Sequence, residues 1–304
     1  MEFNRAVLIY NPAAGRGLHV RPKSLSRAVA ALKTIAREVV LTPTDPNRRA
    51  DALARDAIAS GFDLIVTAGG DGTVNEALQA LASSNATLLV LPAGTANVLA
   101  RETGLPLSPI ATAESAARFQ AFDIPLGVVE FSTSQRYFLL MCGAGFDAAA
   151  VHGLNTAHKR SLGMGAYFLS ALRQFTQRLG RLRTTVGDQT LDSTLVVASK
   201  SRLYGGQLVL APEAHLGAGE FEIVCFSSGS LMGYLAYVAA VLTRTLRWVP
   251  GVRRLRSKAL EVNNVEGSRV YVQTDGELVG EAPAKVRMGP ETVRMLLPPE
   301  FARR

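Results

Sequence analysis

Three glycines surround one carboxylate in the segment Thr67-Ala68-Gly69-Gly70-Asp71-Gly72-Thr73-Val74-Asn75-Glu76. An apolar run, Leu64-Ile65-Val66, precedes the segment, and a helical pattern follows it as far as Leu81. The glycines are therefore expected at the junction between a buried strand and a helix. A chain without Cβ atoms can turn sharply there, and a helix N-terminus favours an anion. We interpret the segment as a phosphate-binding loop; the alternative is an ordinary turn in which Asp71 is the helix N-cap.

The composition is that of a packed globular enzyme long enough for two domains. The chain has 304 residues, of which 48% are hydrophobic and 19% are charged, and both fractions are typical of globular proteins. No apolar run reaches the roughly 18–20 residues that a membrane-spanning helix needs, and the N-terminus lacks a signal pattern. The two cysteines, Cys142 and Cys225, lie far apart in apolar segments and are expected to be structural thiols. We therefore expect a cytoplasmic protein.

The net charge of +8 is concentrated in two stretches without acidic residues, 148–187 and 243–258. In the second stretch, apolar residues that include Trp248 are interleaved with arginines, and this combination suits an anionic membrane surface. We predict that the region Arg244–Lys258 associates transiently with the inner face of the membrane. No helix-turn-helix, zinc-ligand or aromatic-rich strand pattern indicates nucleic-acid binding. A merely solvated basic face is the alternative, and a homodimer is a further option.

Strands and helices alternate in the first third of the chain. Strands are expected at 6–10, 39–41, 63–67 and 87–91. One helix is expected to begin near Pro22, a second to run from Pro46 to Gly61, and a third to follow residues 92–97 and extend through Arg101. This repetition predicts a mostly parallel sheet with helices on both faces. Ligands bind beyond the carboxyl ends of such strands, so four segments are expected to meet there. These are residues 11–17, Thr42, residues 69–73 and residues 94–97.

After residue 121 the pattern changes to strands separated by glycines. Strands are expected at 123–129, 136–142, 195–199 and 222–226, helices at 146–155, 161–178 and 231–245, and turns at Asn263-Asn264, Asp275-Gly276 and Gly289-Pro290. The fold class is therefore α/β. We predict an N-terminal three-layer α/β domain over 1–121 and a mainly antiparallel, β-sandwich-like domain over 122–304, with a cleft between them.

Six motifs, taken in order, resemble those of the diacylglycerol kinase catalytic-domain family in its bacterial soluble lipid-kinase branch. Sphingosine and ceramide kinases are more distant relatives. The segment Gly-Gly-Asp-Gly-Thr alone is shared with NAD kinases and phosphofructokinases, whereas the ordered set is specific. The motifs are Asn11-Pro12-Ala13-Ala14-Gly15, residues 69–76, Leu91-Pro92-Ala93-Gly94-Thr95-Ala96-Asn97, Cys142-Gly143-Ala144-Gly145-Phe146-Asp147, Tyr204-Gly205-Gly206 and Asp275-Gly276-Glu277.

The resemblance implies ATP and Mg²⁺ as cofactors, with the metal bridging the phosphates. It also implies that Asp71 orients the metal or its waters, and that Glu277, with Asp275 beside it, is the general base for a lipid hydroxyl. A hairpin turn is the alternative role for Asp275-Gly276. The residues that the resemblance assigns to the nucleotide are Asn11, Pro12, Gly15, Thr42, Gly69, Gly70, Asp71, Gly72, Thr73, Asn75, Gly94, Thr95 and Asn97.

One departure from the family pattern concerns an accessory Mg²⁺ site in the second domain. Family members with that site carry an Asp-Gly pair after a Pro-Asp/Glu-Ala stretch, whereas here Ala218 takes the place of the aspartate. Alanine offers no oxygen to a hard cation. We therefore expect the accessory site to be lost or weakened and predict no protein-held metal beyond the Mg²⁺ of ATP.

The leading hypothesis is an ATP-dependent kinase that phosphorylates a hydroxyl of a diacylglycerol-like or other long-chain lipid, in phospholipid metabolism. An NAD kinase-like phosphotransferase is the first alternative. Asn11-Pro12, the loop Gly94-Thr95-Ala96-Asn97 and the basic segment around Trp248 favour a lipid over a dinucleotide. The second alternative is a catalytically silent, nucleotide-regulated binding module. The retained carboxylates argue against it, and the missing accessory aspartate keeps it open.

Overall fold

The computed structural model describes residues 2–12, 22–82, 84–145, 181–265 and 269–303. They cluster into two compact units, one formed by Met1–Leu126 with Pro290–Arg304 and the other by Gly127–Gly289. The division differs from the expected one at residue 121, because the last strand of the chain leaves the second unit and ends in the first. The helices expected at 146–155 and 161–178 lie outside the described residues.

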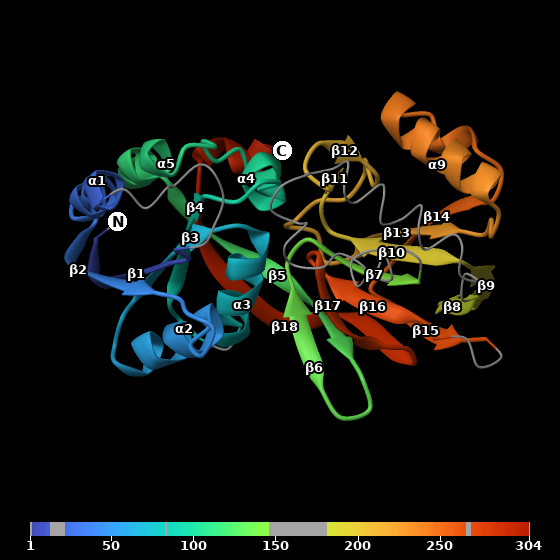
Figure 1. Ribbon diagram of the computed structural model, residues 1–304, viewed down its shortest axis with the longest axis horizontal. Helices are drawn as coiled ribbons and strands as arrows, with labels where there is room; N and C mark the ends of the chain where they lie inside the picture. The colour runs from blue at the N-terminus through green and yellow to red at the C-terminus, as the bar shows by residue number, and fades with distance from the viewer. Residues whose placement is uncertain (1, 13–21, 83, 146–180, 266–268, 304) are drawn as a thin grey trace. The chain divides into compact units, whose positions relative to one another are not determined.

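A parallel sheet flanked by helices forms the first unit (Figure 1). The strand order is β2-β1-β3-β4, followed by the C-terminal part of β18. The strands are β1 (Phe3–Tyr10), β2 (Ala36–Pro43), β3 (Leu64–Gly69), β4 (Thr87–Pro92), β5 (Gln120–Glu130) and β18 (Ala284–Leu297). The helices are α1 (Pro22–Leu32), α2 (Ala50–Ala59), α3 (Asp71–Leu81), α4 (Val98–Thr103) and α5 (Pro109–Ser115), with short 3₁₀ helices at Ala116–Arg118 and Pro299–Arg303.

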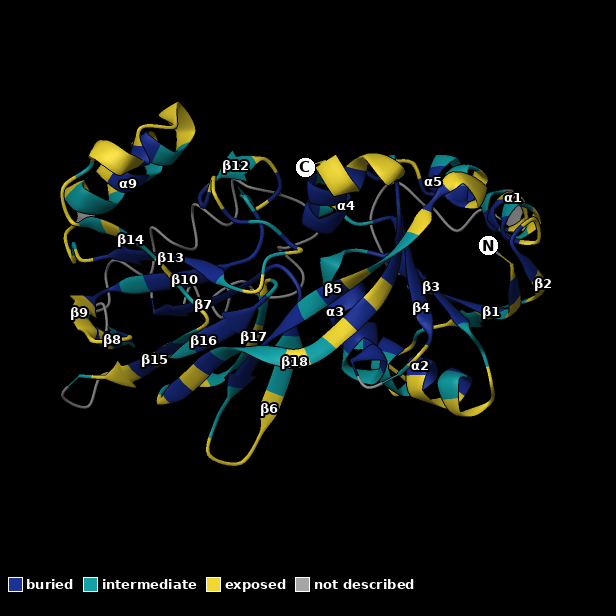
Figure 2. Ribbon diagram, turned by 180° about the vertical axis from the view of Figure 1, so that it is seen from behind, coloured by how far each residue is buried: buried dark blue, intermediate teal, exposed yellow. Residues whose placement is uncertain are grey.

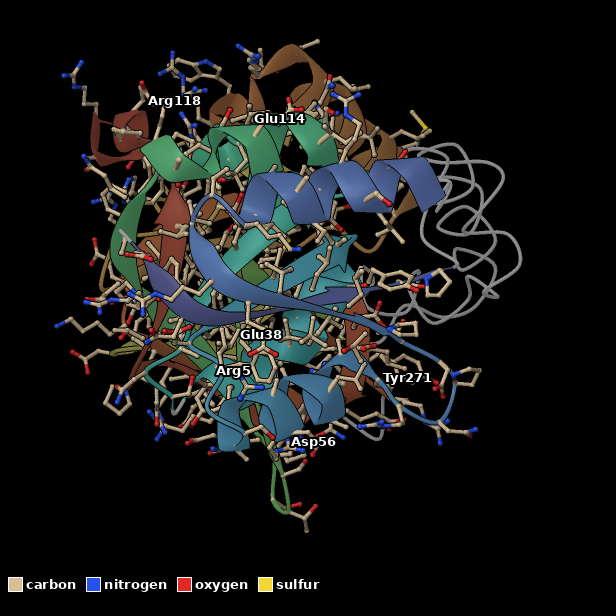
Figure 3. All side chains as sticks on the ribbon, turned by 90° about the vertical axis from the view of Figure 1, so that its left-hand side faces the viewer. Arg5, Glu38, Asp56, Glu114, Arg118 and Tyr271 are labelled. Carbon is tan, nitrogen blue, oxygen red and sulfur yellow. The ribbon has the colours of Figure 1, made fainter. Side chains whose placement is uncertain are left out.

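Both faces of this sheet are covered, which explains why its strands are apolar throughout. Figure 3 shows α1 and α5 on one face and α2 on the other. Leu8, Ile65 and Leu89 are fully buried between the layers. At the outer edge, Arg5 and Glu38 are opposite each other on β1 and β2, and their side chains form an ion pair of 2.7 Å. The three-layer α/β architecture expected from the sequence is confirmed.

The start of α2 differs from the expected start at Pro46. The carboxylate of Asp45 accepts hydrogen bonds from the backbone N–H groups of Asn47 and Arg48, at 2.7 and 2.9 Å, and so closes a turn there. The helix begins at Ala50, whose N–H donates to the carboxylate of Glu76 at 3.0 Å. A local side chain therefore delays the helix, and a distant one caps it.

The second unit contains an antiparallel sheet in the order β14-β13-β10-β7-β16-β17. These strands are β14 (Val252–Ser257), β13 (Phe221–Phe226), β10 (Leu195–Ser199), β7 (Met141–Gly145), β16 (Tyr271–Thr274) and β17 (Glu277–Glu281). The other layer comes from β8 (Leu182–Val186), β9 (Gln189–Ser193), β15 (Ala259–Asn264), β6 (Gln135–Phe138) and the parts of β5 and β18 in this unit. A small hairpin, β11 (Leu203–Tyr204) and β12 (Leu208–Val209), helix α9 (Leu231–Thr243) and a 3₁₀ turn at Leu246–Trp248 complete the unit.

Both layers of the second unit contribute to one apolar core. Phe138 of β6 and Phe221 of β13 stack within it, with ring centroids 5.7 Å apart. Cys142 and Cys225 are buried free thiols in the same core, and burial raises the pKa of both; for Cys225 the pKa is about 11. The mainly antiparallel second domain is thus confirmed, and both thiols are neutral packing groups.

Three expected boundaries in this part of the chain are wrong. Asn263 and Asn264, expected in a turn, are the last two residues of β15 and pair with β8. The strand expected at 136–142 is divided into β6 and β7, because the carboxylate of Asp275 takes the backbone N–H groups of Leu139, Leu140 and Met141. The turn expected at Gly289-Pro290 is absent, since β18 runs through it. Pro290 lies between the segment that pairs with β15 and the segment that pairs with β4, so its missing N–H removes no bond to either strand.

No helix within the described ranges is long and apolar enough to cross a membrane.

Candidate active site

The carboxyl ends of four adjacent strands bring the predicted nucleotide loops to one edge of the parallel sheet. Thr42 is level with Ile9, Ala68 with Tyr10, and Gly69 with Pro92. The N–H of Asn11 donates to the carbonyl of Ala68 at 3.1 Å. Strand β2 lies on one side of β1 and β3 on the other, so the direction of the strand order reverses at β1. Ligands of open α/β sheets bind at such a reversal.

Two of these loops meet backbone to backbone. A Cβ atom on Gly94 would lie 2.4 Å from the Cα of Gly70, so no side chain fits between the loops. Asn97 closes its own loop, since its Oδ1 accepts from the N–H of Gly94 and its Nδ2 donates to the Gly94 carbonyl, both at 2.9 Å. Asn97 has a positive φ of 46°, which asparagine tolerates better than most residues. The pair of loops therefore forms one rigid piece of bare backbone.

Asp71 links the two loops through a helix cap. Its Oδ2 accepts from the N–H of Val98 at 3.0 Å and its Oδ1 from the N–H of Leu99 at 3.1 Å. Both donors are at the start of α4, and the N-cap of Asp71's own helix is Gly70. Asp71 is thus a helix cap, as the alternative interpretation expected, but it caps α4 and not the helix α3 to which it belongs. The carboxylate of Asp71 is thus held at the point where the two loops meet.

Glu76, at the other end of the glycine-rich motif, caps a second helix, and the sequence analysis did not predict this role. Its Oε2 accepts from the N–H of Ala50 at 3.0 Å, and its Oε1 lies 2.8 Å from the Arg49 guanidinium. Helix α3 thus caps α4 with one carboxylate and α2 with the other. The available signal was Arg49 in front of α2, because arginine cannot cap a helix N-terminus and the cap must come from elsewhere.

The remaining predicted nucleotide residues differ in exposure. Pro12 and Thr95 are exposed, and Asn11 and Thr42 are half-buried. Thr73 and Asn75 are buried in α3, and a Cβ on Gly69 would meet the Thr73 hydroxyl at 2.4 Å. In this conformation Thr73 and Asn75 shape the loop from inside the fold. Gly15 lies outside the described residues.

In the second unit, Asp275-Gly276 forms the hairpin turn between β16 and β17. Both residues have positive φ, 51° and 86°, as a type I′ turn requires. The Asp275 carboxylate accepts three backbone hydrogen bonds of 2.9 Å, from residues 139, 140 and 141. Three of its about four acceptor positions are thus filled. The turn interpretation is confirmed, and Asp275 holds the turn in place.

Glu277 is the carboxylate that this turn presents. It is the first residue of β17, is half-buried, and lies opposite Thr274. Its side chain forms no hydrogen bond or ion pair with any other residue in the described ranges. A carboxylate that is fixed at its backbone and has no partner among the described residues can accept a proton from a substrate hydroxyl.

Comparison with known proteins places these features in one family. The model of the diacylglycerol kinase catalytic domain matches residues 5–129, and the YegS C-terminal NAD kinase beta sandwich-like domain matches residues 141–297. A probable lipid kinase YegS-like of Pseudomonas aeruginosa (strain UCBPP-PA14) is 31% identical over 89% of this chain and 88% of its own length. The chain belongs to the diacylglycerol kinase family of lipid kinases.

Other members of the kinase family match over nearly the whole chain. The diacylglycerol kinase of Bacillus subtilis (strain 168) is 28% identical over 98% of both chains. The crystal structure of a diacylglycerol kinase from Bacillus anthracis str. Sterne has a TM-score of 0.77 at 24% identity and covers 98% of this chain and 99% of its own. That likeness supports the fold.

The segment expected to lack an accessory metal site is held by arginines in this kinase. Ala218 contributes only a methyl group, and its N–H donates to the carbonyl of His215 at 3.0 Å. Arg254 pairs with Glu213 at 3.0 Å and also with Glu222, and Arg256 pairs with Glu213 and Glu220. Within the described ranges, no cluster of three or more His, Cys, Asp or Glu side chains could hold a metal. The loss of the accessory site stays a prediction.

Lys200 is a fully buried cation that sequence reasoning did not single out in this kinase. Its ammonium group donates to the carbonyl of Leu216, and its own N–H donates to the carbonyl of Leu140, which is one of the residues clamped by Asp275. Burial lowers the pKa of Lys200 from 10.5 to about 7, while the negative charge of Asp275 opposes part of that shift. The turn and the loop at Leu216 are therefore tied to one titratable group.

The free energy of unfolding of the wild type is expected to rise with pH, and Lys200→Met is expected to abolish this rise. Between about pH 7 and 10.5 the unfolded chain holds a proton on Lys200 that the folded chain lacks. The free energy of unfolding of the wild type should therefore rise across this window relative to the variant, by up to about 1.4 kcal/mol per pH unit. Below pH 7 the cost of the buried charge is fully present. Urea unfolding at several pH values measures the difference, with the exposed Lys285→Met as control; a difference independent of pH would contradict the assignment.

Proposed function

We propose that this kinase transfers the γ-phosphoryl group of ATP to a hydroxyl of a diacylglycerol-like or other long-chain lipid. The lipid oxygen attacks the γ-phosphorus, the bond from that phosphorus to the β,γ-bridging oxygen breaks, and ADP leaves. Glu277 takes the proton of the hydroxyl. Phosphoryl transfer depends mainly on positioning and charge neutralisation, so the loops and Glu277 have separate tasks.

The donor loops suit a nucleotide phosphate. Helix α3 begins directly after Gly70, so its N-terminal N–H groups can donate to phosphate oxygens. The close contact between Gly70 and Gly94 keeps side chains out of the space between the two loops. Asp71 fits the role of a Mg²⁺ ligand, directly or through water, because the N–H groups of Val98 and Leu99 hold its carboxylate where the two loops meet, and Mg²⁺ prefers carboxylate oxygens. When bound, Mg²⁺ would neutralise charge on the phosphates, and Asp71 would orient it.

One observation carries the catalytic part of the proposal. Glu277 is a carboxylate without a partner among the described residues, and it follows a turn whose Asp275 is fixed by three hydrogen bonds. A silent binding module would have no need for such a fixed and unpaired base. An NAD kinase-like phosphotransferase shares the glycine loop, but the relatives that match this chain over most of their length are named for lipids.

ATP consumption with a panel of acceptors tests the proposal. Diacylglycerol, monoacylglycerol, ceramide and sphingosine are offered in mixed micelles, and NAD is offered in solution. We expect turnover with at least one lipid and a loss of at least tenfold in kcat/KM for both Asp71→Ala and Glu277→Ala, since each removes a transition-state contact. Phosphorylation of NAD without any lipid would favour the dinucleotide alternative. ATP binding without turnover of any acceptor would favour the silent module.

A further inference from the structure

Helix α9 of the second unit has an apolar surface that no described residue covers. Its sequence, Leu-Met-Gly-Tyr-Leu-Ala-Tyr-Val-Ala-Ala-Val-Leu-Thr, contains no charged residue. Tyr237 and Ala240 are buried, whereas Met232 is 74% and Leu242 is 63% exposed; Figure 2 shows much of the helix as exposed. A helix that is apolar all round is normally enclosed on all sides, whereas the described residues enclose this one on one side only.

The buried side fixes the helix firmly to its unit. The Tyr237 ring packs edge-on against Phe226, with centroids 4.9 Å apart, and its hydroxyl accepts from the N–H of Ser228 at 3.0 Å. Ser230 caps the helix, since its hydroxyl accepts from the N–H of Gly233 at 3.1 Å. The exposed apolar residues therefore belong to a rigid element.

The turn after α9 adds an exposed aromatic ring to this surface. Leu246 is buried and anchors the turn, while Trp248 is 72% exposed. The Arg247 guanidinium lies over the Trp248 ring, 4.6 Å from its centroid. Tryptophan and arginine together are typical of segments that lie at the boundary between lipid tails and head groups.

Cations without carboxylate partners adjoin the apolar residues. Arg254 and Arg256 are engaged with glutamates, as described above. Arg244, Arg247 and Arg253 form no ion pair with the described residues, and all three are exposed. The whole stretch from 243 to 258 contains no acidic residue. Within the region Arg244–Lys258, the charges of Arg254 and Arg256 are thus neutralised by glutamates, whereas those of Arg244, Arg247 and Arg253 face no described carboxylate.

We propose that α9, the turn Leu246–Trp248 and Arg253 form a docking surface for a bilayer of anionic phospholipids. Phosphate head groups complement the three cations, and each cation near an anionic surface strengthens binding roughly fivefold. A second copy of the chain would instead bring the same cations together, because a two-fold contact repeats one surface. At about 1.5 Å per residue, the 13-residue helix is about 20 Å long, so it lies in the interface and does not cross a core of about 30 Å. The surface serves the proposed function but requires neither nucleotide nor turnover.

Trp248 is the one tryptophan of the chain, and its fluorescence therefore reports on this surface directly. The full-length protein is mixed, without nucleotide, with vesicles of phosphatidylglycerol and phosphatidylcholine or of phosphatidylcholine alone. We expect a blue shift and weaker quenching by acrylamide with the anionic vesicles, and a loss of both with rising salt. An unchanged spectrum with anionic vesicles would overturn the proposal.

Vesicle co-sedimentation of matched double variants tests which residues bind. Met232→Glu/Leu242→Glu and Arg247→Glu/Arg253→Glu are each expected to lower the vesicle partition coefficient at least tenfold. Leu107→Glu and Arg55→Glu, which are exposed positions of the first unit, are expected to change it less than twofold. Circular dichroism confirms that each variant is folded.

Three results would contradict the proposal. The first is that both double variants bind vesicles as the wild type does. The second is that the control variants lose as much binding as the double variants. The third is that the wild type does not bind vesicles but forms a dimer, and that Met232→Glu/Leu242→Glu abolishes this dimer. The outcome is separate from that of the proposed function, which is measured as ATP consumption with acceptors in mixed micelles. Vesicle binding without lipid turnover would leave the docking surface in place and refute only the proposed reaction.

Discussion

Glu277→Gln is expected to lower kcat for lipid phosphorylation by about 10²–10⁴-fold, which is the usual worth of a general base. Glutamine keeps the size and polarity of the side chain but cannot accept the proton of the hydroxyl. Because Glu277 has no partner in the described part of the chain, the substitution breaks no contact there, and folding should be unaffected. Steady-state kinetics with the lipid identified by the acceptor panel measures the effect.

Glu281→Gln is the matched control for this prediction. Glu281 is on the same strand, at the exposed end, and its carboxylate lies 3.5 Å from the Arg269 guanidinium. Exposed pairs of this kind contribute about 0–1 kcal/mol, so the control should retain wild-type kcat and stability. The KM for ATP should also be unchanged in Glu277→Gln, because the nucleotide is assigned to the first unit. Wild-type turnover in Glu277→Gln would remove this residue from the role of base.

Asp275→Ala is expected to lower the free energy of unfolding of the second unit by about 2–4 kcal/mol. The substitution leaves three backbone N–H groups without their charged acceptor, and a hydrogen bond to a charged group contributes about 1.5–3 kcal/mol. The sum is smaller than three such bonds, because the site is only partly buried and water can replace some of them. Thermal unfolding measures the loss.

Hydrogen exchange distinguishes this clamp from a general loss of stability. In Asp275→Ala the amides of Leu139, Leu140 and Met141 should exchange faster than other amides of the same sheet. Asp275→Asn retains one acceptor oxygen and should lie between the wild type and the alanine variant. Unchanged protection of the three amides would show that the carboxylate is not their acceptor in solution.

The sequence predicts the strand-end loops well because parallel β-α units leave few choices of topology. Apolar runs at 64–66 and 87–91 mark strands that are buried on both faces, and the loops after them must then meet at one edge. The hairpin at Asp275-Gly276 was predictable for a similar reason, since few other dipeptides tolerate two positive φ angles.

Contacts between residues far apart in the chain account for what was missed. Asp71 caps α4 across 27 residues, and Glu76 caps α2 across 26. The division of the strand at residue 139 depends on Asp275, which is 136 residues away. The sequence around residue 139 or Ala50 does not indicate that Asp275 or Glu76 is the partner. Local signals therefore gave the elements and the loops, whereas side chains from elsewhere set the exact ends of α2, β6 and β7.

The path of β18 has a consequence for the order in which the protein is made. Strand β4 pairs on one side with β3 and on the other with Arg294 and Met295 of β18, and the tail is packed by Phe301 against Phe122. On the ribosome, strands β1 to β4 emerge first, and β4 keeps an open edge until Arg294 and Met295 of β18 have been synthesised. An open apolar edge is a site of wrong pairing. The unit that starts folding first is thus completed only when the segment with Arg294 and Met295 has been made.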